Sequence, residues 1–251
     1  MTSVITQDDA GLPLGVSRVA VILPAAGSGS RFGAERNKLF ARLGGLPLWI
    51  HAVSALHHHA CVGRIVLAIS TGDRADFETQ RREHAADWPI EFVGGGKERV
   101  DSVRNGLQAV AADESTQWVA VHDAARPLVT SDDLDAVFTT AFTTGAAILA
   151  SPVTSTVKQS IDAGRSSSTI DRSKLWLAQT PQVFRKSILI EAYRRHRGRN
   201  ATDDAELVSR SGVDVALASG SADNLKITYP EDLAIAEAIL RRRQSHNPPG
   251  L

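Results

Sequence analysis

Short apolar segments recur along the chain, and stretches with helical periodicity separate them. Three of these segments are Val19–Leu23, Arg64–Ile69 and Trp118–His122. Strands of a parallel sheet are buried on both faces, so they are apolar throughout instead of alternating with polar residues. Because such strands alternate with helices here, we expect an α/β fold with a doubly wound, mostly parallel sheet.

The pattern contains about six strands and no internal repeat or linker, so 251 residues are expected to form a single domain. Residues 1–17 and 244–251 are expected to be loose tails. A polar stretch from Thr154 to Ile170 interrupts the alternation and is expected to form an exposed hairpin arm or a mobile loop. The other expected strands are Ile90–Val93, Ala146–Ala150 and Val213–Ala218. The expected helices lie near Pro47–His59, Asp73–His84, Val100–Val110, Ser131–Phe142, Arg185–Arg195 and Asp203–Ser211. A last helix is expected beyond Thr228, where Glu231 would complete a capping box.

The overall charge argues against several classes of partner. The chain has 28 basic and 28 acidic residues, so no general positive field would attract nucleic acid or an anionic membrane. Its apolar runs are too short to span a bilayer. With Cys61 as the only cysteine, no internal disulfide can form, which fits a cytoplasmic protein. Because the chain has no general positive field, an anionic ligand must be held by local groups.

The first candidate site segment follows the Val19–Leu23 strand and reads PAAGSGSRFG from Pro24 to Gly33. Small residues let backbone N–H groups approach phosphate oxygens, and Arg31 and Lys38 add positive charge. The glycine spacing is neither GxGxxG nor a P-loop, which argues against a dehydrogenase or a P-loop NTPase. The alternative is a plain strand-to-helix turn with surface charges.

Two more segments follow predicted strands. Gly94-Gly-Gly96 precedes Arg99 and Ser102. The glycines would let a flat base lie against the backbone, and Ser102 could hydrogen-bond the edge of that base; the alternative is a flexible loop with a helix cap. At the end of the next strand, Asp123 is suited to Mg²⁺ and Arg126 to a phosphate. The alternative there is a salt bridge between these two residues.

The last two segments are less specific. Asp171–Gln182 contains Arg172 and Thr180, which could contact a phosphate, but this segment taken alone favours a polar loop. Asn224–Thr228 would place Lys226 on a strand just before the last helix, where it would point into a site or into solvent.

Taken in this order, the five segments resemble the 2-C-methyl-D-erythritol 4-phosphate cytidylyltransferase family, over about Val19 to Leu240. The resemblance implies a Rossmann-like nucleotidyltransferase fold with a protruding β-arm of about residues 154–180, through which two identical subunits form a homodimer. It also implies that CTP and methylerythritol phosphate are the substrates and that Mg²⁺ is the cofactor. The sequence departs from the family pattern at Asn37, Leu39 and Lys97.

The resemblance further implies a role for each site residue. Arg31, Lys38 and Asp123 would be catalytic, and Asp123 would also bind Mg²⁺ and lie near the acceptor. The residues implied to surround CTP are Pro24, Ala25, Ala26, Gly27, Gly29, Gly95, Gly96 and Ser102. Those implied to hold the acceptor, together with Asp123, are Arg126, Thr156, Arg172, Thr180 and Lys226.

The expected reaction needs no protein nucleophile or general base. A phosphate oxygen of the acceptor, already ionised at neutral pH, attacks the α-phosphorus of CTP in line, and pyrophosphate leaves. Two other functions stay open: a cytidylyltransferase for ribitol 5-phosphate, and a catalytically silent regulator that binds nucleotides.

Overall fold

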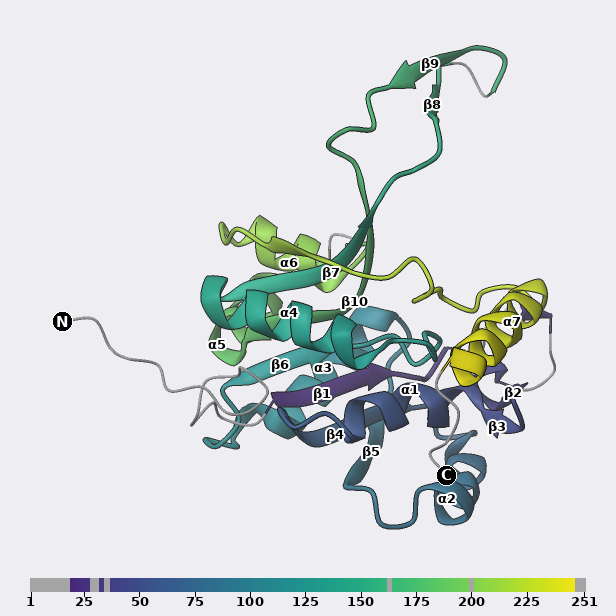
Figure 1. The fold of residues 1–251 in the computed structure, drawn as a ribbon. Helices are drawn as coiled ribbons and strands as arrows, with labels where there is room; N and C mark the ends of the chain where they lie inside the picture. Colours follow the sequence, from purple (N-terminus) through teal and green to yellow (C-terminus); the bar gives the residue numbers. More distant parts are fainter. Residues whose placement is uncertain (1–18, 28–31, 34–36, 162–163, 199–200, 247–251) are drawn as a thin grey trace.

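A seven-stranded sheet with helices on both faces forms the body of the protein in the computed structural model (Figure 1). The structure describes residues 19–27, 32–33, 37–161, 164–198 and 201–246. In spatial order the strands are β11, β7, β10, β6, β1, β4 and β5; only β10 runs against its neighbours. Their bounds are β1 Val19–Pro24, β4 Val62–Ile69, β5 Ile90–Gly94, β6 Trp118–Val121, β7 Ala146–Pro152, β10 Trp176–Arg185 and β11 Ala216–Ser219.

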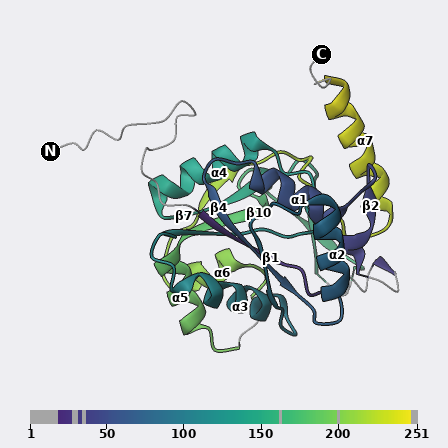
Figure 2. The same cartoon turned by 90° about the horizontal axis from the view of Figure 1, so that it is seen from below.

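Two layers of helices cover the sheet, as the view in Figure 2 shows. One layer consists of α1 (Leu48–His57), α2 (Arg74–His84) and α4 (Ser131–Thr144). The other consists of α3 (Arg99–Ala111), α5 (Lys186–Arg195) and α6 (Asp204–Arg210). The doubly wound, mostly parallel sheet expected from the sequence is thus confirmed.

Strand β1 explains why the sequence carries an unbroken apolar run. Val19, Val21 and Leu23 pack into the core under α1 and α4, whereas Ala20 and Ile22 pack into the core under α3. Residues on both faces are fully buried. A half-exposed strand would instead alternate apolar with polar residues.

The position of β1 also locates the candidate site. On one side of β1 the sheet continues with β4 and β5, and on the other side it continues with β6, so the strand order changes direction at β1. Ligands of open α/β sheets bind at such a switch point, beyond the carboxyl ends of the strands. The segments that follow β1 and β6 therefore meet where a ligand is expected.

The polar segment forms a hairpin arm, one of its two expected conformations. Strands β8 (Val157–Ser160) and β9 (Ser167–Ile170) pair antiparallel, with Lys158 opposite Thr169. Figure 1 shows this hairpin standing clear of the sheet, beyond the ends of β7 and β10.

The C-terminal helix α7 (Glu231–His246) packs beside a small hairpin of β2 (Arg42–Leu43) and β3 (Leu46–Pro47). It includes residues 244–246, so the expected C-terminal tail began too early; residues 1–17 and 247–251 lie outside the described part. The first-turn cap also differs from the expected one, because the Asp232 carboxylate, not Glu231, accepts the N–H groups of Thr228 and Tyr229 at 2.7 and 2.8 Å. Within the described residues, no helix combines the length and hydrophobicity that crossing a membrane requires.

Three other expectations were wrong. The stretch interpreted as a polar loop, Asp171–Gln182, mostly forms β10, and its buried polar side chains are satisfied by hydrogen bonds to neighbouring elements. Asn224–Thr228 has no regular secondary structure and pairs with no strand. Helix α4 is capped by Thr130, whose hydroxyl accepts from the Asp133 N–H at 3.1 Å, and not by Ser131.

Candidate functional site

Two adjacent pockets open at the carboxyl ends of the strands. The larger has a volume of about 400 Å³ and the smaller about 240 Å³. Arg99, Asp123 and Lys226 line both and so form their common wall. The larger pocket is also lined by Pro24–Gly27, Lys38, Gly96 and Ser102, and the smaller by Arg126, Ala178–Thr180, Gln182, Thr202 and Asp203.

The larger pocket gathers most residues that the sequence assigned to the nucleotide. The lining of this pocket includes Pro24, the last residue of β1, and the three residues that follow it, Ala25, Ala26 and Gly27. At Gly27 a Cβ atom would meet no atom within 4 Å, so the backbone there faces open space. Arg31 and Gly29 lie outside the described residues, so the structure does not place them.

The second glycine segment borders the same pocket through Gly96. Gly96 donates its N–H to the Ser102 hydroxyl at 3.0 Å, which ties the loop to the first turns of α3. Gly95 lies behind the lining, where a Cβ atom would come within 2.2 Å of the Ala26 Cβ. The close approach of the two loops therefore requires glycine at this position.

Lys38 reaches the larger pocket from the short 3₁₀ helix η2 (Lys38–Phe40). Its ammonium donates to the Ile227 carbonyl at 2.8 Å. Asn37, one of the departures from the family pattern, directly precedes η2. Its side chain accepts from the Leu39 N–H at 3.1 Å and donates to the Asp73 carboxylate at 2.9 Å. An amide at this position thus fixes the start of η2 through side-chain hydrogen bonds.

Asp123 lies in the common wall and faces three cations. Its Oδ2 is 2.7 Å from the Lys226 ammonium and 3.9 Å from Arg126 Nε, and its Oδ1 is 3.2 Å from Arg99 Nε. Burial alone would raise the pKa of Asp123, but Arg99, Lys226 and Arg126 outweigh it and hold that pKa well below its usual range. The carboxylate is therefore ionised at neutral pH. The salt bridge to Arg126, predicted as an alternative, is the longest of its three ionic contacts.

This ionised carboxylate bears on the expected magnesium ion. Mg²⁺ accepts one or two carboxylates and completes its shell with water and substrate phosphates. Within the described residues no group of three or more His, Cys, Asp and Glu side chains could enclose a metal. Asp123 thus fits Mg²⁺ as a single protein ligand beside phosphate oxygens, not as part of a closed protein cage.

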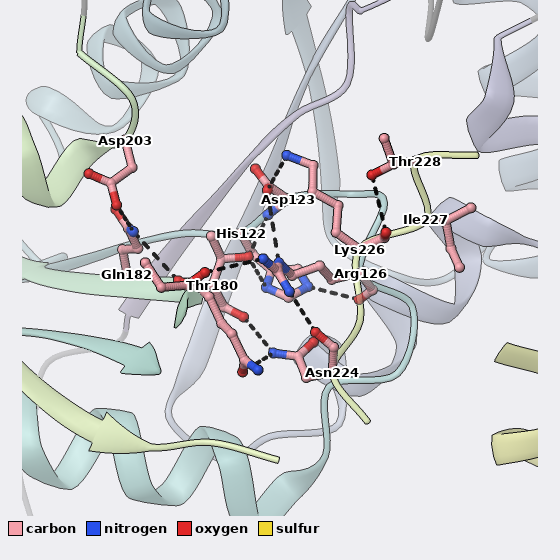
Figure 3. A network of polar contacts seen from close by, with 12 residues as sticks. His122, Asp123, Arg126, Thr180, Gln182, Asp203, Asn224, Lys226, Ile227 and Thr228 are labelled. Atoms are coloured by element: carbon pink, nitrogen blue, oxygen red, sulfur yellow. Dashed lines mark hydrogen bonds and ion pairs between the residues drawn. The ribbon is translucent and has the colours of Figure 1, made fainter. Parts of the chain in front are cut away.

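Arg126 and Thr180, two residues that the sequence assigned to the acceptor, border the smaller pocket. The Arg126 guanidinium donates to the Asn224 carbonyl at 2.6 Å and contacts the Ala178 carbonyl at 3.5 Å. Asn224 is buried, and its amide donates to the Thr180 carbonyl at 2.9 Å (Figure 3). The segment that carries Lys226 is in this way tied to β10 and to Arg126.

The Thr180 hydroxyl takes part in a buried chain of hydrogen bonds with His122 (Figure 3). It accepts the Asp123 N–H at 3.0 Å and lies 3.2 Å from His122 Nδ1, while His122 Nε2 lies 3.1 Å from the Arg126 carbonyl. A carbonyl only accepts, so Nε2 carries the proton and Nδ1 accepts from Thr180. The hydroxyl can then only accept from a ligand, so Thr180 suits a hydroxyl group of the acceptor better than its phosphate.

Thr156 and Arg172 lie apart from both pockets. Both are exposed, and Arg172 donates to the Thr154 carbonyl near the foot of the arm. Within one subunit they therefore do not complete the acceptor site.

Several pocket residues were not among the predicted ones. Arg99 belongs to the glycine segment, but its position in the common wall follows from the start of α3 and not from the spacing. Gln182, Thr202 and Asp203 converge because β10 places Gln182 beside α6, where its amide donates to the Asp203 carboxylate at 2.8 Å. In the sequence, Gln182 closed the fourth segment without being given a role, and Asp203 stood only at the start of an expected helix.

Comparisons with known proteins agree with this geometry. The family model described as 2-C-methyl-D-erythritol 4-phosphate cytidylyltransferase matches residues 19–242. A relative of that name from Rhodopirellula baltica is 52% identical over 236 residues, which cover 90% of this chain and 96% of the relative. One from Bacillus licheniformis is 42% identical over 230 residues, covering 90% and 98%.

Solved structures show the same similarity. The 4-diphosphocytidyl-2C-methyl-D-erythritol synthase of Anaerococcus prevotii superimposes with a TM-score of 0.78 at 26% identity, covering 90% of this chain and 99% of that one. The 2-C-methyl-D-erythritol 4-phosphate cytidylyltransferase of Thermus thermophilus gives 0.73 at 33% identity, covering 89% and 99%.

Proposed function

Because the chain belongs to the 2-C-methyl-D-erythritol 4-phosphate cytidylyltransferase family, we propose that it joins CTP to 2-C-methyl-D-erythritol 4-phosphate. The products are 4-diphosphocytidyl-2-C-methyl-D-erythritol and pyrophosphate, in non-mevalonate isoprenoid synthesis. The observation that carries this proposal is the pair of pockets with one common wall, since a transfer between two substrates requires two sites that meet at the reacting atoms.

The nucleotide occupies the larger pocket and the acceptor the smaller. The acceptor phosphate oxygen forms a bond to the α-phosphorus of CTP, and the bond from that phosphorus to the bridging oxygen breaks. Pyrophosphate leaves with the electron pair of the broken bond. No proton has to move, because the attacking oxygen is already ionised, and catalysis consists of alignment and charge neutralisation.

The charged residues divide this work between the two pockets. Lys38 lies where it can neutralise the phosphates of CTP, and Arg31 is assigned the same role from the sequence. Arg126 and Lys226 bind the acceptor phosphate, with Lys226 at the junction. Because Arg126 and Lys226 contact backbone carbonyls and Asp123, a phosphate can replace or share these partners when the substrate binds.

Asp123 is proposed to hold Mg²⁺ together with the triphosphate. The ion supplies positive charge that neutralises the phosphoryl oxygens during transfer. Asp123 can serve in this way because Arg99 keeps it oriented and its neighbours keep it ionised. Lys226, which contacts the same carboxylate, can turn towards the acceptor phosphate.

The arm, taken as residues 154–180, is proposed to complete the acceptor site of a second subunit. It carries Thr156 and Arg172, which its own subunit leaves away from the pockets. It also exposes apolar side chains: Ile161 is 67% and Leu177 58% exposed, as expected of a surface that another chain covers. We therefore propose a homodimer in which each site receives Arg172 from its partner. We also propose a cytoplasmic location, which the single cysteine of the chain and its small-molecule substrates support.

The activity is tested by pyrophosphate release from CTP with each acceptor separately. Methylerythritol phosphate should give turnover, and ribitol 5-phosphate should give much less. A faster reaction with ribitol 5-phosphate would transfer the assignment to that acceptor. Nucleotide binding without turnover on either would leave the silent regulator.

The shared site is tested by mixing two inactive variants, Arg172→Ala and Lys226→Ala. A mixed dimer would contain one site with Lys226 intact and an intact arm from its partner. Random exchange of subunits should then restore about a quarter of wild-type activity. If the mixture stays as inactive as its components while light scattering shows mixed dimers, the arm does not serve the partner's site.

A further inference from the structure

We propose that Arg99 is a positioning residue that fixes the Asp123 carboxylate at the junction of the two pockets, and that Asp204 and Tyr193 fix Arg99 in turn. The inference builds on the proposed cytidylyl transfer, because Asp123 matters only if both substrates meet there. It assigns a functional role to two residues, Asp204 and Tyr193, that line neither pocket.

Arg99 is held from two sides. It is the first residue of α3, and its Nε donates to Asp123 Oδ1 at 3.2 Å while its Nη1 donates to Asp204 Oδ2 at 2.7 Å. A guanidinium presents N–H groups on different edges of one rigid plane, so it can bind two carboxylates at a fixed angle. A lysine ammonium carries the same charge but has no such plane.

Asp204 is a firm anchor for this guanidinium. Its side chain is only 1% exposed, and its Oδ1 accepts the Tyr193 hydroxyl at 2.5 Å. Its own N–H donates to the Gln182 side-chain carbonyl at 3.1 Å. Every oxygen of the buried carboxylate thus has a partner, which an ionised group inside a protein requires.

The network connects four elements to one oxygen atom of the site. Tyr193 comes from α5, Asp204 from the start of α6, Arg99 from α3, and Asp123 from the segment that follows β6. Tyr193 is only 6% exposed and packs in the core under α3, α5 and α6. Rigid elements therefore determine where the carboxylate in the common wall points.

The charges give the same network a second effect. Around the junction three cations, Arg99, Arg126 and Lys226, face two carboxylates, which leaves one net positive charge. Without Arg99 the charge of Asp123 would be less compensated and its Oδ1 would lose its partner. Both changes act at the reacting phosphates and leave the lining at Ala25–Gly27 and Ser102 intact. Loss of positioning should therefore lower kcat more than it raises KM for CTP.

The kinetic test uses Tyr193→Phe, Arg99→Lys and Arg99→Ala, with Arg74→Lys as the control. Arg74 forms an exposed ion pair with Glu78 on α2 and lines neither site pocket. Tyr193→Phe keeps the ring and should lower kcat about three- to tenfold, with KM for CTP changed by less than about twofold. Arg99→Lys should lose almost as much kcat as Arg99→Ala. Added methylguanidinium should restore part of the activity of Arg99→Ala but not that of the other variants.

A second readout does not depend on activity. In ¹⁵N-labelled wild-type protein, the Arg99 Nε–H, identified from its absence in Arg99→Lys, should exchange slowly with water, and in Tyr193→Phe it should exchange faster. Wild-type kcat in Arg99→Lys, or unchanged Nε–H exchange together with unchanged kcat in Tyr193→Phe, would overturn the proposal. If instead wild-type enzyme fails to turn over CTP, the proposed function fails, and the exchange measurement still decides whether Tyr193 orders Arg99.

Discussion

His122 offers a quantitative prediction, because the fold holds it neutral. Its side chain is fully buried, with Nδ1 accepting from Thr180 and Nε2 donating to the Arg126 carbonyl. Burial lowers the pKa of His122 from 6.5 to about 4; the nearby Arg126 charge acts in the same direction, and Asp123 and the backbone hydrogen bonds oppose it. A proton on Nδ1 would also break the bond from the Thr180 hydroxyl, which supports Asp123.

The sign follows from proton binding. As pH falls below 6.5 the unfolded chain takes up a proton at this residue, whereas the native chain does so only near pH 4, so stability is lost across that interval. Each pKa unit corresponds to about 1.4 kcal/mol. This single histidine should therefore cost about 3 kcal/mol of unfolding free energy between pH 6.5 and pH 4.

The assay is urea unfolding of wild type and His122→Gln between pH 7.5 and pH 4 at one protein concentration. The glutamine variant starts less stable but cannot take up this proton, so the difference between the two free energies should shrink by about 3 kcal/mol as pH falls. Other titrating groups cancel in that difference. A difference that stays constant over the interval would show that the buried imidazole is not held neutral, and the hydrogen-bond chain described above would then be wrong.

Three further predictions concern the larger pocket and its wall. Lys38→Ala should lower kcat about ten- to hundredfold and change CTP binding less, since its charge acts on the transferring phosphates; steady-state kinetics with an unchanged kcat would exclude this role. Asp123→Asn should shift the Mg²⁺ titration of activity to higher concentrations, and identical titration curves would leave Asp123 only its ion pairs. Gly95→Ala would place a methyl group 2.2 Å from the Ala26 Cβ and should lower stability by about 1–3 kcal/mol; a thermal melt equal to that of wild type would refute this packing.

Much of the fold was predictable because single segments carry its signals. The run Val19–Leu23 is apolar throughout since it is buried on both faces, and Val103, Leu107 and Val110 recur on the buried side of α3. The rule that ligands bind beyond the strand ends then directed attention to Asp123 and the loop after Pro24. These inferences need only local periodicity and chain order.

The errors arose where tertiary partners replace local signals. Strand β10 contains Gln179, Thr180 and Gln182, which look like loop residues, yet hydrogen bonds from other elements allow all three to be buried. Lys226 lies in an irregular segment that pairs with no strand and is tied to β10 by Asn224. The place of Arg99 depends on Asp204, which is 105 residues further along the chain. No spacing rule reaches over that distance.

The distribution of buried polar groups indicates how the fold holds the common wall in place. Burial of a polar side chain is unfavourable unless each of its groups finds a partner. Among the described residues, thirteen polar or charged side chains are buried, and ten of them line the two pockets or bond directly to a group that does. These ten are Asn37, Ser102, His122, Asp123, Ser151, Gln179, Thr180, Gln182, Asp204 and Asn224. A core that served stability alone would not concentrate them at one edge of the sheet, so their hydrogen bonds are best understood as holding the charges of the common wall in place. Such preorganisation is what a reaction without nucleophile or proton transfer depends on, because alignment and neutralisation are then all that the protein supplies.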